Sequence, residues 1–412
     1  MTLPPQAPAL RAACISLTAA LLLPGCQGES TNSSAARRDT LPNGVVTVTY
    51  DALPRAPADT FVAVVRIGSV DASEGVAFGD VRGIEVGADG TIYVLDFQAS
   101  EVRAFTPGGE HIATLTRRGE GPGELLQANG MVFDGAGTLW VQDHGQFALI
   151  GLSPAGTELT RRPMMVTGYG FVWNVTVDDD GVFWQPWSHS DPRPGGRKPG
   201  LHAGSYRRYY KSFDPKTASY DSVFLGEATS QAYMIQYEGG NSVFGLPFDT
   251  GPITAMDRTG AIWTGSSDLY RLARLNRSGD TTLVLSIDEL GPPITAEDRD
   301  DWLERFNRFQ ERAPALKAEL AALFPERKPV FDQLIVDDER RLWVRRSVPR
   351  GESPAYDVFD AEGEYLARVR MPPDMHPYIP FVIRRGRLYG VVRDSLDVPY
   401  VVAGPVPALE SF

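Results

Sequence analysis

Six copies of one short phrase recur along the chain, and they constrain its fold more than any other feature. Each copy has a turn of small or polar residues, an aliphatic residue and then Tyr or Trp, as in residues 89–94 and 135–141. The aromatic positions are Tyr93, Trp140, Trp184, Trp263, Trp343 and Tyr389. Three of the five gaps between them are 44–47 residues, which is the length of one four-stranded propeller blade. The repeat therefore predicts an all-β fold, a β-propeller.

The first repeat unit indicates how one blade divides into strands. Apolar and β-branched runs at residues 81–86, 91–95, 102–105 and 111–116 are separated by turn-forming Asp-Gly and Pro-Gly-Gly sequences. The sixth unit has only three such runs. We therefore expect residues 61–67, upstream of the first unit, to supply the outer strand that closes the last blade, because this pairing removes an exposed sheet edge.

Two gaps of 79 and 80 residues indicate insertions in a six-bladed β-propeller with four-stranded blades, with seven blades as the alternative. Residues 186–208 are rich in Pro and Gly and are predicted to be a long loop, and residues 227–251 could hold an added hairpin.

Residues 295–324 are predicted to be a helical insertion between the fourth and fifth units. Thr295 can cap a helix, and Trp302, Phe306 and Phe309 follow at helical spacing. We expect these three aromatic side chains to hold the insertion on the channel mouth as a cover. A lid or a partner-docking surface is the alternative.

The N-terminus has the features of an export signal. Arg11 precedes an apolar run at residues 12–23, which is too short to span a bilayer as a helix and is typical of a signal peptide. The run ends in Leu23-Pro24-Gly25-Cys26, which resembles a bacterial lipobox. Residues 1–25 are therefore predicted to be a lipoprotein signal peptide, and Cys26 is predicted to carry the lipid.

Residues 26–43 are rich in Ser, Thr, Ala, Asn and Gly and lack apolar periodicity, so they are predicted to be a flexible tether. Gln27 after the lipidated residue favours the outer membrane over the inner one. Cys14 lies within the signal, and Cys26 is the only other cysteine. The mature chain would then have no free thiol, which excludes cysteine nucleophiles, thiolate metal sites and disulfides.

Residues 118–124 read Arg-Gly-Glu-Gly-Pro-Gly-Glu and close the first unit. The phrase Gly-x-Gly-Pro-Gly-Glu, together with the repeats, resembles the six-bladed β-propeller lipoproteins of bacteria, which are similar to NHL-repeat proteins. The matching residues are Gly119, Gly121, Pro122, Gly123 and Glu124. The resemblance covers residues 60–405, within a predicted propeller domain of 44–405. It implies a fold and a location in the cell envelope, and no particular reaction.

The long insertions are expected to share one face of the propeller. Loops between second and third strands, and loops from each fourth strand to the next blade, surround the channel mouth, and function concentrates on such loops. The candidate ligand-binding residues on this face are Arg117, Arg118, Glu120, Glu124, Trp187, His189, Arg207, Arg345 and Arg393. Aromatic and cationic side chains together suit stacking on a sugar or binding of an anion. Structural roles compete: Glu124 can hold the Gly-Pro-Gly turn, and Trp187 can pack against the next blade.

No catalytic constellation is evident. The five His residues lack metal-ligand spacing, and there is no Gly-x-Ser-x-Gly motif. Residues 178–181 depart from the spacing of a calcium loop and are predicted to be a turn. Asp96, Asp143 and Asp268 follow second strands and are predicted to hydrogen-bond loop backbone.

The chain is therefore expected to be a monomeric, envelope-anchored binding or scaffolding propeller without a cofactor. Its partner would be a glycan, a peptide or an envelope protein, because a net charge of −12 argues against nucleic acid. The alternative is a metal-dependent propeller enzyme of lactonase or lyase type with calcium or zinc in the channel. Asn129 and Asn174 lie near the inner strands and would be candidate ligands.

Overall fold

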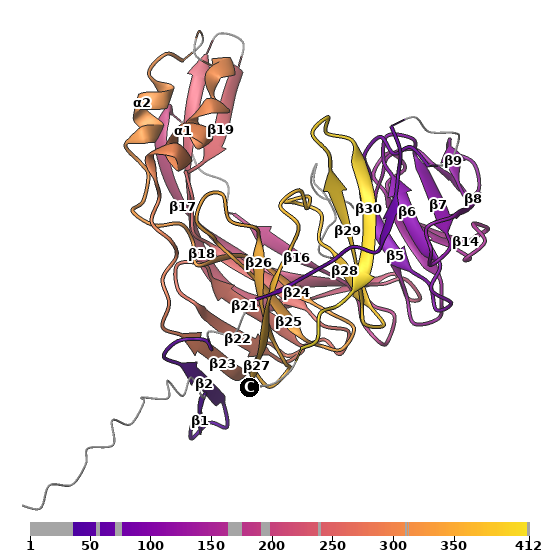
Figure 1. Cartoon of the computed structure of the whole chain (residues 1–412), viewed down its shortest axis with the longest axis horizontal. Helices are drawn as coiled ribbons and strands as arrows, with labels where there is room; N and C mark the ends of the chain where they lie inside the picture. The colour runs from indigo at the N-terminus through magenta and orange to yellow at the C-terminus, as the bar shows by residue number, and fades with distance from the viewer. Residues whose placement is uncertain are drawn as a thin grey trace, which may run out of the picture. The chain divides into compact units, whose positions relative to one another are not determined.

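Every repeat unit forms an antiparallel sheet in the computed structural model (Figure 1). The structure describes residues 36–54, 58–70, 76–163, 175–190, 198–237, 240–309, 311 and 313–409. These residues contain six sheets of four to six strands, one separate two-stranded pair and two α-helices. The predicted mostly-β, propeller-like fold is confirmed.

The first two sheets are four-stranded. The first contains β5 (Val81–Val86), β6 (Ile92–Asp96), β7 (Glu101–Phe105) and β8 (His111–Thr114). The second contains β11 (Ala128–Phe133), β12 (Leu139–Asp143), β13 (Ala148–Leu152) and β14 (Glu158–Pro163). Between them in the chain, β9 (Arg117–Arg118) and β10 (Glu124–Leu125) pair in parallel.

The third sheet differs most from the prediction. It contains β15 (Thr176–Val177), β16 (Phe183–His189), β17 (Gly200–Asp214), β18 (Ser219–Tyr237) and β19 (Gly240–Gly245). The predicted long loop at 186–208 is wrong at both ends, because β16 continues to His189, β17 begins at Gly200 and His189 pairs with Arg207. Residues 191–197 of the predicted loop lie outside the described residues. The extension is stabilised from its other side, since β17 pairs with β18 from Gly200 to Asp214. The added hairpin is confirmed as the end of β18 and β19.

The remaining units form the fourth to sixth sheets. The fourth contains β20 (Pro252–Met256), β21 (Ile262–Ser266), β22 (Arg271–Leu275) and β23 (Thr281–Ile287). The fifth contains β24 (Phe331–Val336), β25 (Leu342–Arg346), β26 (Ala355–Phe359) and β27 (Tyr365–Arg370). The sixth contains β28 (Val382–Arg384), β29 (Arg387–Arg393) and β30 (Pro399–Pro405).

The segment before the first sheet adds edge strands to the last three sheets. The hairpin of β1 (Arg37–Thr40) and β2 (Val46–Tyr50) extends the fourth sheet, where β2 runs parallel to β23. The short β3 (Asp59–Thr60) lies beside β27, and β4 (Val65–Ile67) pairs antiparallel with β30. β4 lies within the strand predicted at 61–67.

The predicted tether at residues 26–43 needs correction at its end. Arg37–Thr40 form β1, because β2 supplies a hairpin partner and Arg37 bridges to Asp51 at 2.7 Å. The rest of the predicted tether before residue 36, the signal peptide and Cys26 lie outside the described residues.

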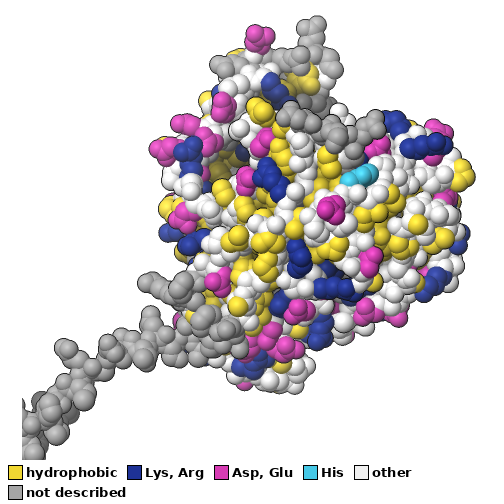
Figure 2. All heavy atoms as spheres, turned by 45° about the vertical axis from the view of Figure 1, so that its right-hand side comes forward, with side chains coloured by type: hydrophobic (Ala, Val, Ile, Leu, Met, Phe, Trp, Pro, Cys, Tyr) yellow, Lys and Arg dark blue, Asp and Glu magenta, His cyan; other side chains and the backbone are white. Residues whose placement is uncertain are grey.

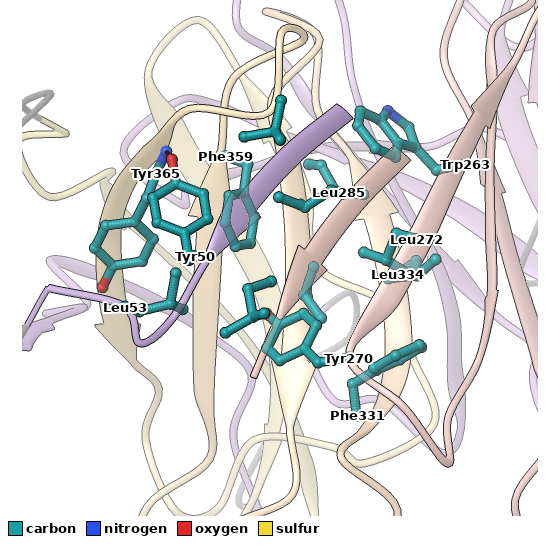
Figure 3. Packing of buried hydrophobic residues seen from close by; sticks show 14 of the residues in the cluster. Tyr50, Leu53, Trp263, Tyr270, Leu272, Leu285, Phe331, Leu334, Phe359 and Tyr365 are labelled. Carbon is teal, nitrogen blue, oxygen red and sulfur yellow. Dashed lines mark hydrogen bonds between the residues drawn. The ribbon is translucent and has the colours of Figure 1, made fainter. Parts of the chain in front are cut away.

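Hydrophobic clusters join each sheet to the next. A further cluster joins the sixth sheet to the first, where Tyr389 and Val391 of β29 pack with Ile84 and Ile92. Figure 3 shows the cluster between the fourth and fifth sheets, where Tyr50 from the N-terminal segment lies beside Phe359. Burial of this apolar surface is the main force that holds the sheets together.

The helical insertion is present but does not pack where the sequence indicates. It contains α1 (Ala296–Glu304), the 3₁₀ turn Asn307–Phe309 and α2 (Leu316–Ala321). Thr295 caps α1 as predicted, since its hydroxyl accepts a hydrogen bond from Asp298 N at 3.1 Å.

The aromatic residues of the insertion pack on the third sheet, so the predicted cover on the channel mouth is wrong. The rings of Phe306 and Phe309 each lie 5.1 Å from that of Phe244 in β19, and Ile235 of β18 completes the contact. α1 and α2 lie beside β19 in Figure 1. The extended β18–β19 hairpin supplies the apolar face that the sequence placed in a loop.

A buried Asp holds the first turn of several sheets to the repeated Trp. Asp178 accepts hydrogen bonds from Asp180 N, Val182 N and Trp184 Nε1 at 2.7–3.0 Å. Asp134 and Asp337 make the same three kinds of bond, each to a Trp six residues later. The predicted turn at 178–181 is thus confirmed.

Replacement of Asp178 by Ala should destabilise the protein by about 3 kcal/mol, because it leaves two backbone N–H groups and an indole N–H without an acceptor. Urea denaturation measures the change. The neighbouring Asp179 is exposed and only loosely paired with Arg258 at 3.6 Å, so Asp179→Ala should stay within about 0.5 kcal/mol. Equal effects of the two substitutions would contradict this role.

A fragment that begins at Ser69 should lose cooperative melting, since it lacks the edge strands of three sheets and the buried side chains of Tyr50 and Phe61. Calorimetry compares it with a fragment that begins at Ala36. If the two fragments melt alike, β1–β4 are not needed for the assembly of the sheets.

Candidate functional site

The first strands of all six sheets line one central cavity of about 190 Å³. These strands are β5, β11, β15, β20, β24 and β28. Arg82 lies where β5 begins, whereas Arg258, Asp338 and Arg384 lie where later first strands end. The cavity therefore extends along the length of the strands and has charged side chains toward both ends.

Glu85 is a buried carboxylate in the wall of this cavity. Its Oε2 has no hydrogen-bond partner, and Arg384 Nη2 is 3.8 Å away. Burial raises the pKa of Glu85, while Arg384 and Arg258 oppose the rise. This end of the cavity therefore combines the carboxylates of Glu85 and Asp338 with the guanidinium groups of Arg258 and Arg384.

A connected group of charged and polar side chains lies at the Arg82 end, and we call it the Arg82 cluster. Its members are Asp80, Arg82, Asn129, His144, His376 and Arg393. Arg82 donates from Nε to Asp80 Oδ2 at 2.8 Å and from Nη1 to Asn129 Oδ1 at 3.1 Å. Arg393 Nη2 lies 3.9 Å from Asp80 Oδ1. Two guanidinium groups from different sheets thus share one carboxylate.

Backbone geometry fixes the protonation of His376. Its Nδ1 accepts hydrogen bonds from Tyr378 N at 3.2 Å and Ile379 N at 3.1 Å, so the neutral ring carries its proton on Nε2. Burial lowers the pKa of His376, and Arg393 lowers it further, against the opposing effects of Asp80 and Asp397. A neutral imidazole therefore lies beside the shared carboxylate.

His144 occupies a comparable position beside Arg82. Burial lowers the pKa of His144, with Asp143 raising it and Arg82 lowering it. Within the described part of the chain, its buried Nε2 has no hydrogen-bond partner, and neither has the buried Nε of Arg393. Buried polar atoms without partners are uncommon and mark positions where a ligand or water could bind.

Two of the predicted ligand-binding residues adjoin this cluster. Arg393 is a member, and its Nη1 also donates to the exposed Asp397 at 2.8 Å. Arg345 is paired with Asp332 and donates to the carbonyl of Pro377, next to His376, at 2.7 Å. The predicted arginines at positions 345 and 393 are thus brought near one another.

The Gly-Pro-Gly-Glu loop has internal partners. Glu124 accepts from Gly121 N at 2.9 Å and from Arg117 Nε at 2.7 Å, and a Cβ at Gly119 would overlap its carboxylate. Arg118 donates to the carbonyl of Gln98 at 2.7 Å, while Glu120 is exposed.

The same loop is tied to the second sheet. Gly123 N donates to Glu158 Oε2 at 2.7 Å, and Arg161 donates to the carbonyl of Gly121. These contacts favour the structural interpretation of the loop, which connects the first two sheets.

The other predicted residues lie on the extended strands of the third sheet. Trp187 and His189 are in β16 and Arg207 is in β17, where it pairs with His189. The Nζ of Lys211 lies 3.8 Å from the centroid of the Trp187 ring. The structure thus divides the predicted site into three groups: the Gly-Pro-Gly-Glu loop, the third sheet and the Arg82 cluster.

The loop aspartates follow the prediction in two of three cases. Asp96 accepts from Gly79 N and Gln98 N, and Asp143 accepts from Leu126 N and Gln127 N. Asp268 is exposed, and Ser267 bonds the equivalent backbone N–H instead.

Sequence reasoning missed Asp80, Arg82, His144 and His376 as members of a site. The available signal was the Asp-x-Arg pair where the first inner strand begins, and the Asn one residue into the next inner strand. Figure 2 shows basic and acidic side chains intermixed over one face of the molecule, so surface charge would not have revealed the cluster.

The described part of the chain contains no group of three or more His, Cys, Asp or Glu residues that could hold a metal ion. Asn129 faces the cation Arg82, which does not suit a metal ligand, and Asn174 lies outside the described residues. Among the described helices, none is long and apolar enough to cross a membrane.

No protein-family model and no curated protein matches the chain. Solved structures that are similar to it include the following three. A DUF4221 family member from Bacteroides vulgatus has 11% identity over 84% of this chain and 98% of its own, with a TM-score of 0.47. Virginiamycin B lyase from Staphylococcus aureus has 11% identity over 83% of this chain and 88% of its own, with a TM-score of 0.36. A gluconolactonase from Xanthomonas campestris has 15% identity over 86% of this chain and 99% of its own, with a TM-score of 0.37. Because these identities are low, we argue the site from this chain's own side chains.

The pKa values of His144 and His376 should lie below 6.5 in the folded protein. Replacement of Arg393 by Met should raise the pKa of His376, because the substitution removes a nearby positive charge. NMR titration of the ring protons measures both. The same substitution should change the pKa of His144 less than that of His376, so His144 serves as the control. Since the unfolded chain takes up these protons more readily, both residues should reduce stability as the pH falls below about 6.5. An unchanged His376 pKa in the variant would refute the arrangement.

Proposed function

We propose that the six sheets are the blades of a closed six-bladed propeller, exported and anchored to the outer membrane through lipid on Cys26. Three observations support the ring: each first strand lines the same cavity, the sixth and first sheets share a hydrophobic cluster, and β4 pairs with β30. The residues of the two long gaps form the extended third sheet and the helical insertion, which favours six blades over seven. The export signal in the sequence supports the location.

The propeller's function, in this proposal, is to bind an acidic ligand at the Arg82 cluster. The observation that carries it is the convergence of Arg82 and Arg393 on the single carboxylate of Asp80. The second acidic partner of Arg393, Asp397, is 77% exposed, so water screens that pair. Within the Arg82 cluster two guanidinium groups therefore share one carboxylate, and the partly buried environment strengthens their attraction for an anion.

The chemistry of the cluster suits a carboxylate, sulfate or phosphate group. A guanidinium presents a planar set of N–H donors that matches two oxygens of such a group. Arg393 Nε is buried and has no hydrogen-bond partner among the described residues. The neutral ring of His376 adds an N–H donor at Nε2 without adding charge. A glycan or peptide that carries an acidic group would satisfy these donors.

The alternative function is a metal-dependent enzyme of lactonase or lyase type. Two imidazoles with lowered pKa values could act as bases near neutral pH, which is the observation in its favour. Metal analysis of purified protein distinguishes the two functions. Stoichiometric calcium or zinc would favour the enzyme.

Binding should be tested with a soluble fragment of residues 36–412 on arrays of acidic and neutral glycans and peptides. We expect acidic ligands to bind, and Arg82→Met with Arg393→Met to weaken them at least tenfold, because charge-assisted hydrogen bonds are lost. Arg350→Met, an exposed arginine paired with Asp301, is the matched control. Affinity should also fall as salt increases. Preference for neutral ligands, or unchanged binding by a folded double variant, would reject the proposal.

A further inference from the structure

One face of the third sheet presents a row of polar side chains between two rows of aromatic ones. The register of β16, β17 and β18 places these residues opposite one another. The rows are Phe183–Phe213–Tyr220, Gln185–Lys211–Ser222 and Trp187–Tyr209–Phe224. Successive rows are two residues apart along each strand, about 6.6 Å. The alternation brings aromatic and hydrogen-bonding groups together on the scale of a sugar ring.

Only part of this face is covered by another sheet. Phe183 and Phe213 pack in the cluster with the second sheet. Tyr220 and Phe224 remain 57% and 53% exposed. A pocket of about 450 Å³ opens here, and its lining includes Gln185, Trp187, Lys211, Tyr220 and Ser222 together with the exposed Asp221. Its volume is in the range of small-ligand sites.

Lys211 lies in the polar row and provides its charge. Its Nζ is 3.8 Å from the centroid of the Trp187 ring, a cation–π contact that positions the ammonium group without neutralising it. Lys211 forms no ion pair with any residue that the structure describes. Gln185 and Ser222, on either side of it in the row, are uncharged. The row therefore offers one available positive charge flanked by neutral hydrogen-bonding groups.

We propose that this pocket binds an acidic saccharide, such as a uronic acid unit of a polysaccharide. The exposed ring of Tyr220 stacks on the apolar face of the sugar. Lys211 binds the carboxylate of the sugar, and Gln185 and Ser222 bind its hydroxyl groups.

The middle strand of the pocket has no free backbone edge, because β17 is paired on both sides over Lys211 and Phe213. The outer edges of β16 at Gln185 and of β18 at Ser222 pair with no other described strand, and such edges bind extended peptides. An acidic peptide is therefore the competing ligand in the test, whereas the aromatic rings and the charge of Lys211 favour the saccharide. The pocket shares no lining residue with the Arg82 cluster, so the two proposals can fail separately.

Calorimetric titration of the residue 36–412 fragment with oligogalacturonate, oligoalginate and hyaluronan fragments tests the proposal, with neutral cello- and maltooligosaccharides of equal length as comparison. We expect at least one uronate oligosaccharide to bind more tightly than the neutral ones. Lys211→Met and Tyr220→Ala should each weaken it about tenfold. Lys216→Met, in the turn between the same strands, should leave it unchanged.

Melting temperatures show whether each variant is folded, and Lys211→Gln is a second variant if Lys211→Met is not. The double substitution of Arg82 and Arg393 should leave this binding intact, which separates the pocket from the proposed function. The proposal is overturned if none of the uronates binds, if a folded Lys211 variant binds as well as wild type, or if an acidic octapeptide of glutamates binds as tightly as the saccharide.

Discussion

Hydrophobic packing between neighbouring sheets is the interaction on which the rest of the structure depends. A sheet of four short strands cannot bury both of its faces alone, so each one is stabilised by the sheets on either side. The cluster that joins Tyr389 and Val391 of the sixth sheet to the first one gives the last sheet a partner as well. The edge strands β1–β4 contribute to the same packing, since Tyr50 and Phe61 are buried between the last three sheets.

The Arg82 cluster follows from this packing. Asp80 precedes β5 and Arg82 lies near its start, whereas Arg393 is the last residue of β29. Contact between the first and sixth sheets brings Arg393 Nη2 within 3.9 Å of Oδ1 of Asp80, whose Oδ2 pairs with Arg82. The packing of these two sheets therefore sets the positions of Arg82 and Arg393 relative to Asp80. The pocket on the third sheet has a different origin. It exists because Phe183 and Phe213 pack on the second sheet while Tyr220 and Phe224 of β18 remain more than half exposed.

Local features were predicted well and remote pairings were not. The six sheets, the turn at Asp178, the cap at Thr295 and the strand that contains Val65–Ile67 all depend on residues close together in the sequence or on the repeat itself. The segment at 186–208 was predicted to be a loop because its Pro and Gly content is high. Residues 200–208 form a strand because partners in β18, from Gly226 to Met234, satisfy their backbone groups. The helical insertion was misplaced for the same reason.

The sequence by itself determined the strands, the turns and the number of repeats, because turn chemistry and alternating apolar residues act over a few positions. The tertiary structure alone decided which charged side chains meet. Asp80 and Arg393 lie at opposite ends of the chain, and their carboxylate and guanidinium groups approach only because the last sheet packs on the first. The same holds for the open row around Lys211, whose accessibility depends on where the neighbouring sheet ends.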